Sequence, residues 1–378
     1  MKELTQILAA LAAAPSDDVR KWALATLVTV EGSSYRRAGA RMLWRGENLP
    51  PIGGISGGCL EDDLKIHCAD VVKTGAAKTI IYDTTSENDL VWGVGTGCHG
   101  IVRVVVEPAR QAVPALSYVP NAWPRREPVT VATIFRFHRA NAAQKLGTTL
   151  GWSDDLPVQR GNTARIITKP TCWQPMPRAA IERATRACLR ARKSTTRIFR
   201  NLPGSPEIFF DYLPPPPTLA IFGAGDDAQP LARMAAELGW QVHVTDPRPA
   251  YATRERFPEA VAVGSDAPPL DEYTLAVVMT HHYIHDVPAL RDLLPRKLAY
   301  LGLLGSKKRA EKILADLERD GLQITPDMRA RFHAPVGLDI GADTPETIAL
   351  SILAEMQSVL GRREAKPLRD RAKAIHDA

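Results

Sequence analysis

Two stretches dense in glycine, residues 53–61 and 93–100, each contain one cysteine near their end. Glycine loses more conformational freedom on folding than any other residue, so this density indicates positive φ angles or a close approach of the backbone to a ligand. Successive backbone N–H groups in such a loop form a concave site for phosphate or another oxyanion. We therefore expect a ligand to bind at these two segments.

The cysteines of these stretches, Cys59 and Cys98, add a second kind of chemistry. A helix is predicted over residues 61–72, and a thiol at the N-terminus of a helix forms thiolate readily. Thiolate is the form that attacks sulfur and binds soft metals. The alternative interpretation is that both cysteines are small buried residues in tight turns.

A third loop, residues 223–228, reads Gly-Ala-Gly-Asp-Asp-Ala and follows a predicted strand. In a dinucleotide-binding turn of this kind, Gly223 allows the tight turn, Gly225 lets a phosphate approach the backbone, and Ala228 lets helix and strand pack closely. Asp246 ends the next predicted strand, where an acidic residue binds a ribose hydroxyl. The pattern predicts a Rossmann-type fold and a candidate site for a nucleotide such as NAD(P).

The two aspartates of this loop, Asp226 and Asp227, leave a second interpretation open. They would sit at a helix N-terminus, where they favour the helix dipole but repel a pyrophosphate. On that interpretation the domain is a scaffold, and the aspartates cap the helix in place of a ligand.

Three further features lie outside the glycine loops. His281 and His282 follow a predicted strand, where they could act as acid and base or bind a metal, or could simply satisfy local backbone groups. Ser306, in another strand-to-helix turn, could cap the helix, or could form a possible second site with His281 and His282. The basic stretch 178–200 could bind an acidic partner or a cofactor phosphate, or could be an exposed helix face.

The elements that position these residues change in character at the four prolines 214–217. After them, predicted strands and helices alternate, which indicates a doubly wound parallel sheet. The predicted strands there are 218–222, 242–245, 260–263, 275–279 and 298–303, and the helices are 228–238, 287–294, 307–318 and 344–360. Before the prolines, the predicted strands are 22–30, 40–43, 79–82, 101–106 and 207–212, and residues 110–164 show no clear pattern.

The predicted architecture is thus α/β. A mixed α+β domain with the glycine–cysteine loops spans 1–213, a Rossmann-like domain spans 218–361, and a charged tail covers 362–378. In the last helix, Thr344 should cap the N-terminus and Gly361 should follow the C-terminus.

Composition supports a globular, cytoplasmic protein. The chain has 378 residues, 45% of them hydrophobic and 24% charged, and a net charge of +6 that favours anionic ligands. No nucleic-acid motif is found, no apolar run is long enough to cross a membrane, and residues 1–15 predict an amphipathic helix instead of a signal peptide. The odd cysteine count and the lack of CxxC argue against disulfides and zinc, and we interpret Cys68, Cys172 and Cys188 as packing residues. A homodimer is the default expectation for an oligomer.

Taken together, the motifs resemble those of the XdhC/CoxI family. The segments that carry the resemblance are 26–43, 53–61, 93–108, 217–225, 246–249, 301–309 and 337–342. The resemblance implies a molybdenum cofactor chaperone for xanthine dehydrogenase-type or CO dehydrogenase-type enzymes. Such a protein holds the cofactor while a cysteine desulfurase supplies the terminal sulfur, and then delivers it to the large subunit of the apo-molybdoenzyme.

By the same resemblance, the cofactor site would comprise parts of both glycine loops. Cys59 and Cys98 would contact molybdenum, and the loops would hold the pterin phosphate or the molybdenum oxo group. The residues implied are Gly57, Gly58, Cys59, Glu61, Gly95, Gly97 and Cys98.

Two other functions stay open on sequence alone. One is an NAD(P)-dependent oxidoreductase that uses His281 or His282 as acid and base. The other is a sulfurtransferase in which Cys59 carries a persulfide.

Overall fold

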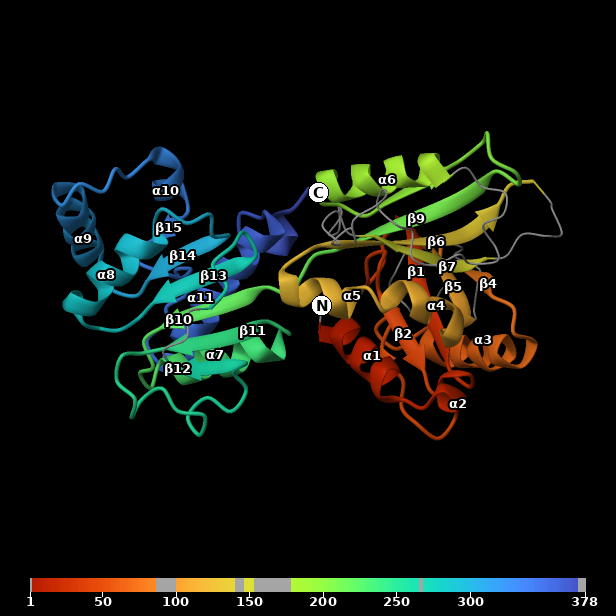
Figure 1. Ribbon diagram of the computed structural model, residues 1–378, viewed down its shortest axis with the longest axis horizontal. Helices are drawn as coiled ribbons and strands as arrows, with labels where there is room; N and C mark the ends of the chain where they lie inside the picture. Colours follow the sequence, from red (N-terminus) through yellow and green to blue (C-terminus); the bar gives the residue numbers. More distant parts are fainter. Residues whose placement is uncertain (1, 86–99, 140–145, 153–177, 265–267, 373–378) are drawn as a thin grey trace, which may run out of the picture. The chain divides into compact units, whose positions relative to one another are not determined.

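The computed structural model describes residues 2–85, 100–139, 146–152, 178–264 and 268–372. The chain divides into two compact units, which consist mainly of Glu3–Pro215 and Pro216–Arg371, and the division falls within the four prolines (Figure 1). Each unit has its own sheets and its own hydrophobic core, and the first of them contains the Cys59 loop.

The first unit begins with the expected amphipathic helix, which buries Leu4, Ile7 and Leu8. Its first sheet is antiparallel, with the order β3-β2-β1-β5-β4. The strands are β1 (Ala23–Gly32), β2 (Arg41–Trp44), β3 (Ile52–Gly53), β4 (Lys78–Asp83) and β5 (Gly100–Pro108). The helices of this unit are α1 (Lys2–Ala13), α2 (Ser16–Val19), α3 (Glu61–Thr74), α4 (Ala109–Leu116), α5 (Val119–Ala122) and α6 (Arg178–Ala191), with a 3₁₀ turn at Trp123–Arg125.

Helix α3 confirms the helix predicted from residue 61, and it packs on the first sheet. Leu64, Cys68 and Val71 recur at helical spacing and are completely buried against β1 and β5. The helix ends at Gly75, which takes the left-handed conformation (φ 69°) that glycine adopts most readily. This packing fixes the first turn of α3 and the loop that precedes it.

A second antiparallel sheet of the first unit has the order β7-β6-β9-β8. Its strands are β6 (Val129–Phe137), β7 (Gly147–Trp152), β8 (Thr195–Ile198) and β9 (Pro206–Leu213). The basic stretch expected to be helical to residue 200 is helical only to Ala191. The prediction was wrong beyond that point because Arg192 turns the chain (φ 50°) and the β-branched residues that follow it pair with β9.

The second unit contains a six-stranded parallel sheet with the order β12-β11-β10-β13-β14-β15 (Figure 1). The strands are β10 (Thr218–Phe222), β11 (Gln241–Thr245), β12 (Ala262–Gly264), β13 (Thr274–Val278), β14 (Tyr300–Leu303) and β15 (Phe332–His333). In chain order this is the 3-2-1-4-5-6 arrangement of the doubly wound dinucleotide-binding fold. The predicted Rossmann-like sheet is therefore confirmed.

Helices cover both faces of the parallel sheet. They are α7 (Ala228–Glu237), α8 (Tyr283–Leu293), α9 (Lys307–Arg319), α10 (Pro326–Ala330) and α11 (Pro345–Gly361), and a 3₁₀ turn follows at Leu368–Asp370. One core cluster joins α7 and α11 to the sheet, and another joins α8 and α9 to it. Thr344 caps α11 as expected, but Gly361 belongs to the helix and Arg362 takes the left-handed position after it.

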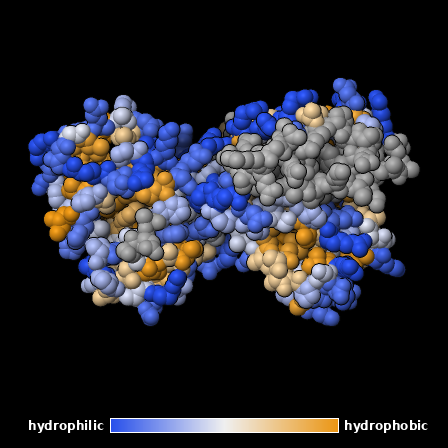
Figure 2. Space-filling model, viewed as in Figure 1, coloured by the Kyte–Doolittle hydropathy of each residue, from blue (hydrophilic) through white to orange (hydrophobic). Residues whose placement is uncertain are grey.

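The surface of each unit mixes hydrophilic and hydrophobic residues (Figure 2). Within the described part of the chain, no helix combines the length and apolar character needed to cross a bilayer.

Candidate functional site

Glu61, the first residue of α3, organises the loop that precedes it. Its Oε1 accepts the backbone N–H groups of Ile55 (3.0 Å) and Ser56 (2.8 Å), and its Oε2 accepts the hydroxyl of Ser56 and the N–H of Leu60. Burial raises the pKa of Glu61, but the hydrogen bonds from Ser56 and Ile55 outweigh it and leave the pKa below its usual value. The carboxylate of Glu61 therefore fixes the shape of the loop, and hydrogen bonds from the loop already engage both of its oxygens.

Ser56 is the second organising residue, and no motif in the sequence pointed to it. Its hydroxyl oxygen accepts the N–H groups of Gly58 and Leu60, both at 3.1 Å. Gly58 has φ 117°, a conformation that disfavours any side chain. The only signal in the sequence was a serine that lies between glycines, five residues before a glutamate.

The residues that this network leaves at the surface are Gly57, Gly58 and Cys59, which are all exposed. In the described structure the N–H groups of Gly57 and Cys59 donate no hydrogen bond to protein. The loop therefore presents a thiol and two backbone donors to solvent. Such a surface can hold an anion through the donors and a soft metal through the sulfur.

The first turn of α3 carries two more carboxylates, and both have protein partners. Asp62 pairs with Lys65 at 2.7 Å, and Asp63 accepts the hydroxyl of Tyr82 at 2.7 Å. The hydrogen bond and the charge of Lys65 lower the pKa of Asp62. The positive end of the helix dipole is thus balanced by carboxylates of the protein itself.

The second predicted loop, with Gly95, Gly97 and Cys98, lies outside the described residues. Its end at Gly100 is described. The N–H of Gly100 donates to the Thr84 hydroxyl (3.1 Å), and a Cβ on Gly100 would lie 2.3 Å from the carbonyl oxygen of Ser33. Position 100 requires glycine because the backbone after β1 passes so close to it that any side chain would clash with Ser33.

The other cysteines that are described have the packing role expected of them. Cys68 and Cys188 are buried, and burial raises the pKa of Cys68 to about 12. Cys172 lies outside the described residues. Across the same described ranges, no three His, Cys, Asp or Glu side chains gather as metal ligands would. The prediction that Cys59 and Cys98 both contact molybdenum stays a prediction, because Cys98 lies outside these ranges.

In the second unit, the loop after β10 forms the turn that the sequence predicts. Gly223 has φ 123°, and a Cβ there would lie 2.5 Å from the carbonyl oxygen of Met279. Ala228 is completely buried, as close packing of helix and strand requires. Above Gly225, however, the Oδ1 of Asp227 lies 2.6 Å from the place that a Cβ would occupy. A side chain of the protein covers the position where a phosphate would approach.

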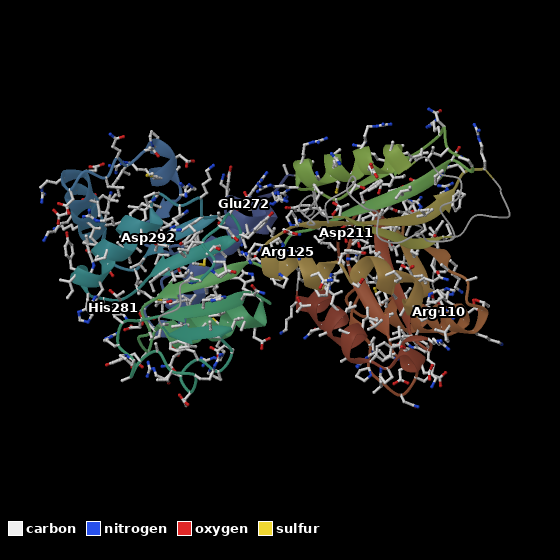
Figure 3. The ribbon with its side chains drawn as sticks, viewed as in Figure 1. Arg110, Arg125, Asp211, Glu272, His281 and Asp292 are labelled. Atoms are coloured by element: carbon white, nitrogen blue, oxygen red, sulfur yellow. The ribbon has the colours of Figure 1, made fainter. Side chains whose placement is uncertain are left out.

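Asp227 is held there by His281, which lies on the loop after β13 (Figure 3). Its Oδ2 lies 2.7 Å from the Nε2 of His281, and His281 has the strained φ of 60°. Asp226 pairs instead with Arg256 at 2.9 Å. Sequence alone left open that the aspartates cap α7; Asp227, the N-cap residue, does not, because its carboxylate bonds across the loops and makes no cap hydrogen bond.

Asp246 lies beside this loop, as predicted, but its carboxylate is occupied by protein groups. It accepts the N–H of Ala224 (2.7 Å), the N–H of Arg248 (2.9 Å) and both guanidinium arms of Arg248 (2.9 and 2.8 Å). Burial would raise the pKa of Asp246, but the bonds from Arg248 and Ala224 lower it to about 2. In this arrangement neither oxygen is open to a ribose.

The remaining candidates in this unit have structural partners. Ser306 caps α9 through the N–H of Arg309, as predicted. Arg309 also bonds the buried Asp286. His282 precedes α8, and its ring meets that of His285 edge to face at 5.9 Å. The structure therefore brings Gly223, Gly225, Asp246 and His281 to the edge of the sheet where the strands end, and Ser306 follows β14 at the same edge, where its hydroxyl caps α9.

Comparison with known proteins agrees with this two-unit organisation. Residues 17–83 match the XdhC and CoxI family, and residues 219–356 match the XdhC Rossmann domain. A protein of Bacillus subtilis described as a probable subunit of xanthine dehydrogenase is 33% identical over 90% of this chain and 93% of its own. A molybdenum cofactor insertion chaperone of Escherichia coli, PaoD, is 26% identical over 89% of this chain and 82% of its own.

A solved structure resembles the whole chain. The crystal structure of a xanthine dehydrogenase from Bacillus halodurans covers 97% of this chain and 98% of its own, with a TM-score of 0.73 and 28% identity. The described part of the first glycine–cysteine loop and the Rossmann turn both lie within the matched segments. This protein belongs to the XdhC and CoxI family.

Proposed function

We propose that this protein binds the molybdenum cofactor at the Cys59 loop and delivers it to a molybdoenzyme of the xanthine dehydrogenase or CO dehydrogenase type. One observation carries the proposal: an exposed thiol and two backbone N–H donors without protein acceptors share a loop that Glu61 and Ser56 hold in place. The relatives named as a cofactor insertion chaperone and as part of a xanthine dehydrogenase support it.

The residues of the loop suit this cargo chemically. Molybdenum in the cofactor has a sulfur-rich environment, and the sulfur of Cys59 is a soft donor atom. The N–H groups of Gly57 and Cys59 suit a phosphate or an oxo group. Glu61, for which the family resemblance implies a contact with the cofactor, is proposed instead to act only through the shape of the loop. Gly95, Gly97 and Cys98 stay proposed contacts on the strength of their sequence alone.

The proposal includes partners and a location. We propose that a cysteine desulfurase supplies the terminal sulfur while the cofactor is held, that the apo-enzyme large subunit then receives it, and that the chaperone acts as a homodimer. A cytoplasmic location suits the exposed free thiol of Cys59, because such thiols persist in reducing compartments.

The test is retention of the cofactor by the purified protein. The protein would be incubated anaerobically with molybdenum cofactor, separated from free ligand, and assayed for pterin fluorescence after oxidation. We expect about one pterin per chain, with a large loss in Cys59→Ala and none in Cys188→Ala, a control that removes a cysteine of the same unit from another core cluster. Failure of the intact protein to retain pterin would contradict the proposal.

The geometry counts against one of the two alternative functions, and a measurement on Cys59 separates the other from the chaperone. For NAD(P), the phosphate position is covered by Asp227 and the ribose position is closed by Arg248, so we propose that the Rossmann unit acts as a scaffold. For a sulfurtransferase, the exposed Cys59 would carry persulfide. Mass spectrometry after incubation with a desulfurase and cysteine would find an adduct of one sulfur on Cys59 in that case.

A further inference from the structure

Tyr35 lies beside the Cys59 loop with most of its ring in solvent. The residue is 65% exposed. A Cβ built on Gly57 would lie 3.7 Å from its Cγ, Cδ1 and Cε1 atoms, so the ring contacts the loop where the loop has no side chain. Within the described residues, no aromatic ring or cation packs against Tyr35. The rest of the ring is free for a ligand.

The backbone around Tyr35 is anchored on both sides. Before it, Gly32 pairs with Gly100 at the end of the sheet, next to the close contact of Ser33 with Gly100. After it, the guanidinium of Arg36 bonds both carboxylate oxygens of Glu3, one of them at 2.8 Å. The backbone that carries the ring is therefore anchored near the loop before any ligand arrives, and less backbone entropy is lost on binding.

We propose that Tyr35 is a stacking platform for the flat heterocycle of the cargo. This inference rests on the proposed function and extends it. The donors and the thiol of the Cys59 loop can recognise an anion and a soft metal, but they offer no surface to a planar ring. An exposed aromatic side chain provides that surface, since heterocycles stack favourably on tyrosine.

The expected loss of affinity follows from measurements of stacking on aromatic residues in general. Removal of one aromatic platform weakens binding of a heterocycle by roughly ten- to a hundredfold. We expect Tyr35→Ala to raise the dissociation constant for molybdenum cofactor by that factor. Tyr35→Phe should stay within about threefold of the intact protein, because stacking requires the ring and not the hydroxyl.

The experiment measures cofactor binding by the full-length protein under anaerobic conditions. The variants are Tyr35→Ala, Tyr35→Leu and Tyr35→Phe, with Tyr251→Ala as the control because it removes another exposed tyrosine, in the second unit. Leucine keeps apolar area without a π system. Thermal unfolding checks that each variant is folded, and circular dichroism of the bound pterin reports whether its ring lies against an aromatic side chain.

The outcomes separate the inference from the proposed function. Weak binding by the alanine and leucine variants, with near-normal binding by the phenylalanine variant, is the expected result. If the intact protein and Tyr35→Ala bind equally, or if Tyr35→Phe is as weak as Tyr35→Ala, the platform is overturned while the chaperone proposal stands. If the intact protein binds no cofactor, both fail.

Discussion

Replacing Glu61 by glutamine should loosen the Cys59 loop without disturbing the helix that follows. The carboxylate receives four donors: the N–H groups of Ile55, Ser56 and Leu60 and the hydroxyl of Ser56. An amide keeps one acceptor oxygen and places a donor where the other oxygen was. Hydrogen bonds to a charged group contribute about 1.5–3 kcal/mol each and neutral ones about 1 kcal/mol. We therefore expect the free energy of local opening of the loop to fall by about 2 kcal/mol, after the loop donors have partly rearranged around the amide.

Hydrogen exchange measures this loss directly at the loop amides. A change of about 2 kcal/mol in the free energy of local opening corresponds to roughly thirtyfold faster exchange. The amides of Ile55, Ser56 and Leu60 should show it, whereas those in the middle of α3 should not. Asp62→Asn is the matched control, because Asp62 lies on the same turn and, among the described residues, bonds Lys65 and no group of the loop. Unchanged exchange in Glu61→Gln would refute the role given to this carboxylate.

The same variant tests the sign of the pH dependence. The pKa of Glu61 is lower in the folded protein than its ordinary value of 4.5, so its stabilising effect is complete above pH 4.5 and is lost as the pH falls through the folded pKa. After correction for intrinsic exchange rates, protection of the loop should fall with acid in the intact protein. Glu61→Gln should show no such fall, because its amide does not titrate.

Three further changes have defined outcomes. Gly58→Ala should lower the free energy of unfolding by about 1–2 kcal/mol, measured by urea denaturation, because the φ of Gly58 is 117°. Gly57→Ala should be nearly neutral, because a Cβ there fits at ordinary contact distance. Equal effects of the two changes would contradict the loop geometry. Arg41→Ala should cost about 3–5 kcal/mol, since it leaves its partner Asp211 (2.7 Å, Figure 3) buried and uncompensated, and restoration by a paired Asp211→Ala would support this cause. Asp227→Ala combined with Arg248→Ala should uncover the glycine turn and free the carboxylate of Asp246, so NADH titration should detect binding only in this double variant; no binding there would contradict these two contacts as the cause of exclusion.

Most elements of the second unit could be predicted because they are local in origin. Strands such as β10 and β13 are short apolar runs, and helices such as α7 and α9 have clear amphipathic spacing. Strand β15 and helix α10 were not predicted, because two and five residues are too few to show a period. Residues 110–164 gave no pattern for physical reasons that the structure supplies. Helices α4 and α5 are short and contain proline, and β6 is buried on both faces, so it lacks the alternation that identifies a strand.

The site was harder to predict than the fold because side-chain partners come from distant segments. Glu61 was named as a cofactor contact, which stays untested, and the structure shows its carboxylate bonded to the backbone of residues 55–60. Asp246 was placed at the right strand end, yet Arg248 and the glycine turn occupy its carboxylate. Tyr35 became visible only when the structure placed its ring against Gly57.

The balanced charge at the start of α3 has a consequence for selectivity inside a cell. Free phosphate and nucleotides are abundant there, and a helix N-terminus without acidic residues would attract them. Here Glu61, Asp62 and Asp63 already supply negative charge at that end. Charge alone therefore gives a competing anion little advantage, and lasting occupancy requires a ligand that also engages the sulfur. In the proposed function, the empty loop thus stays free of these abundant competitors until the scarce cofactor is present.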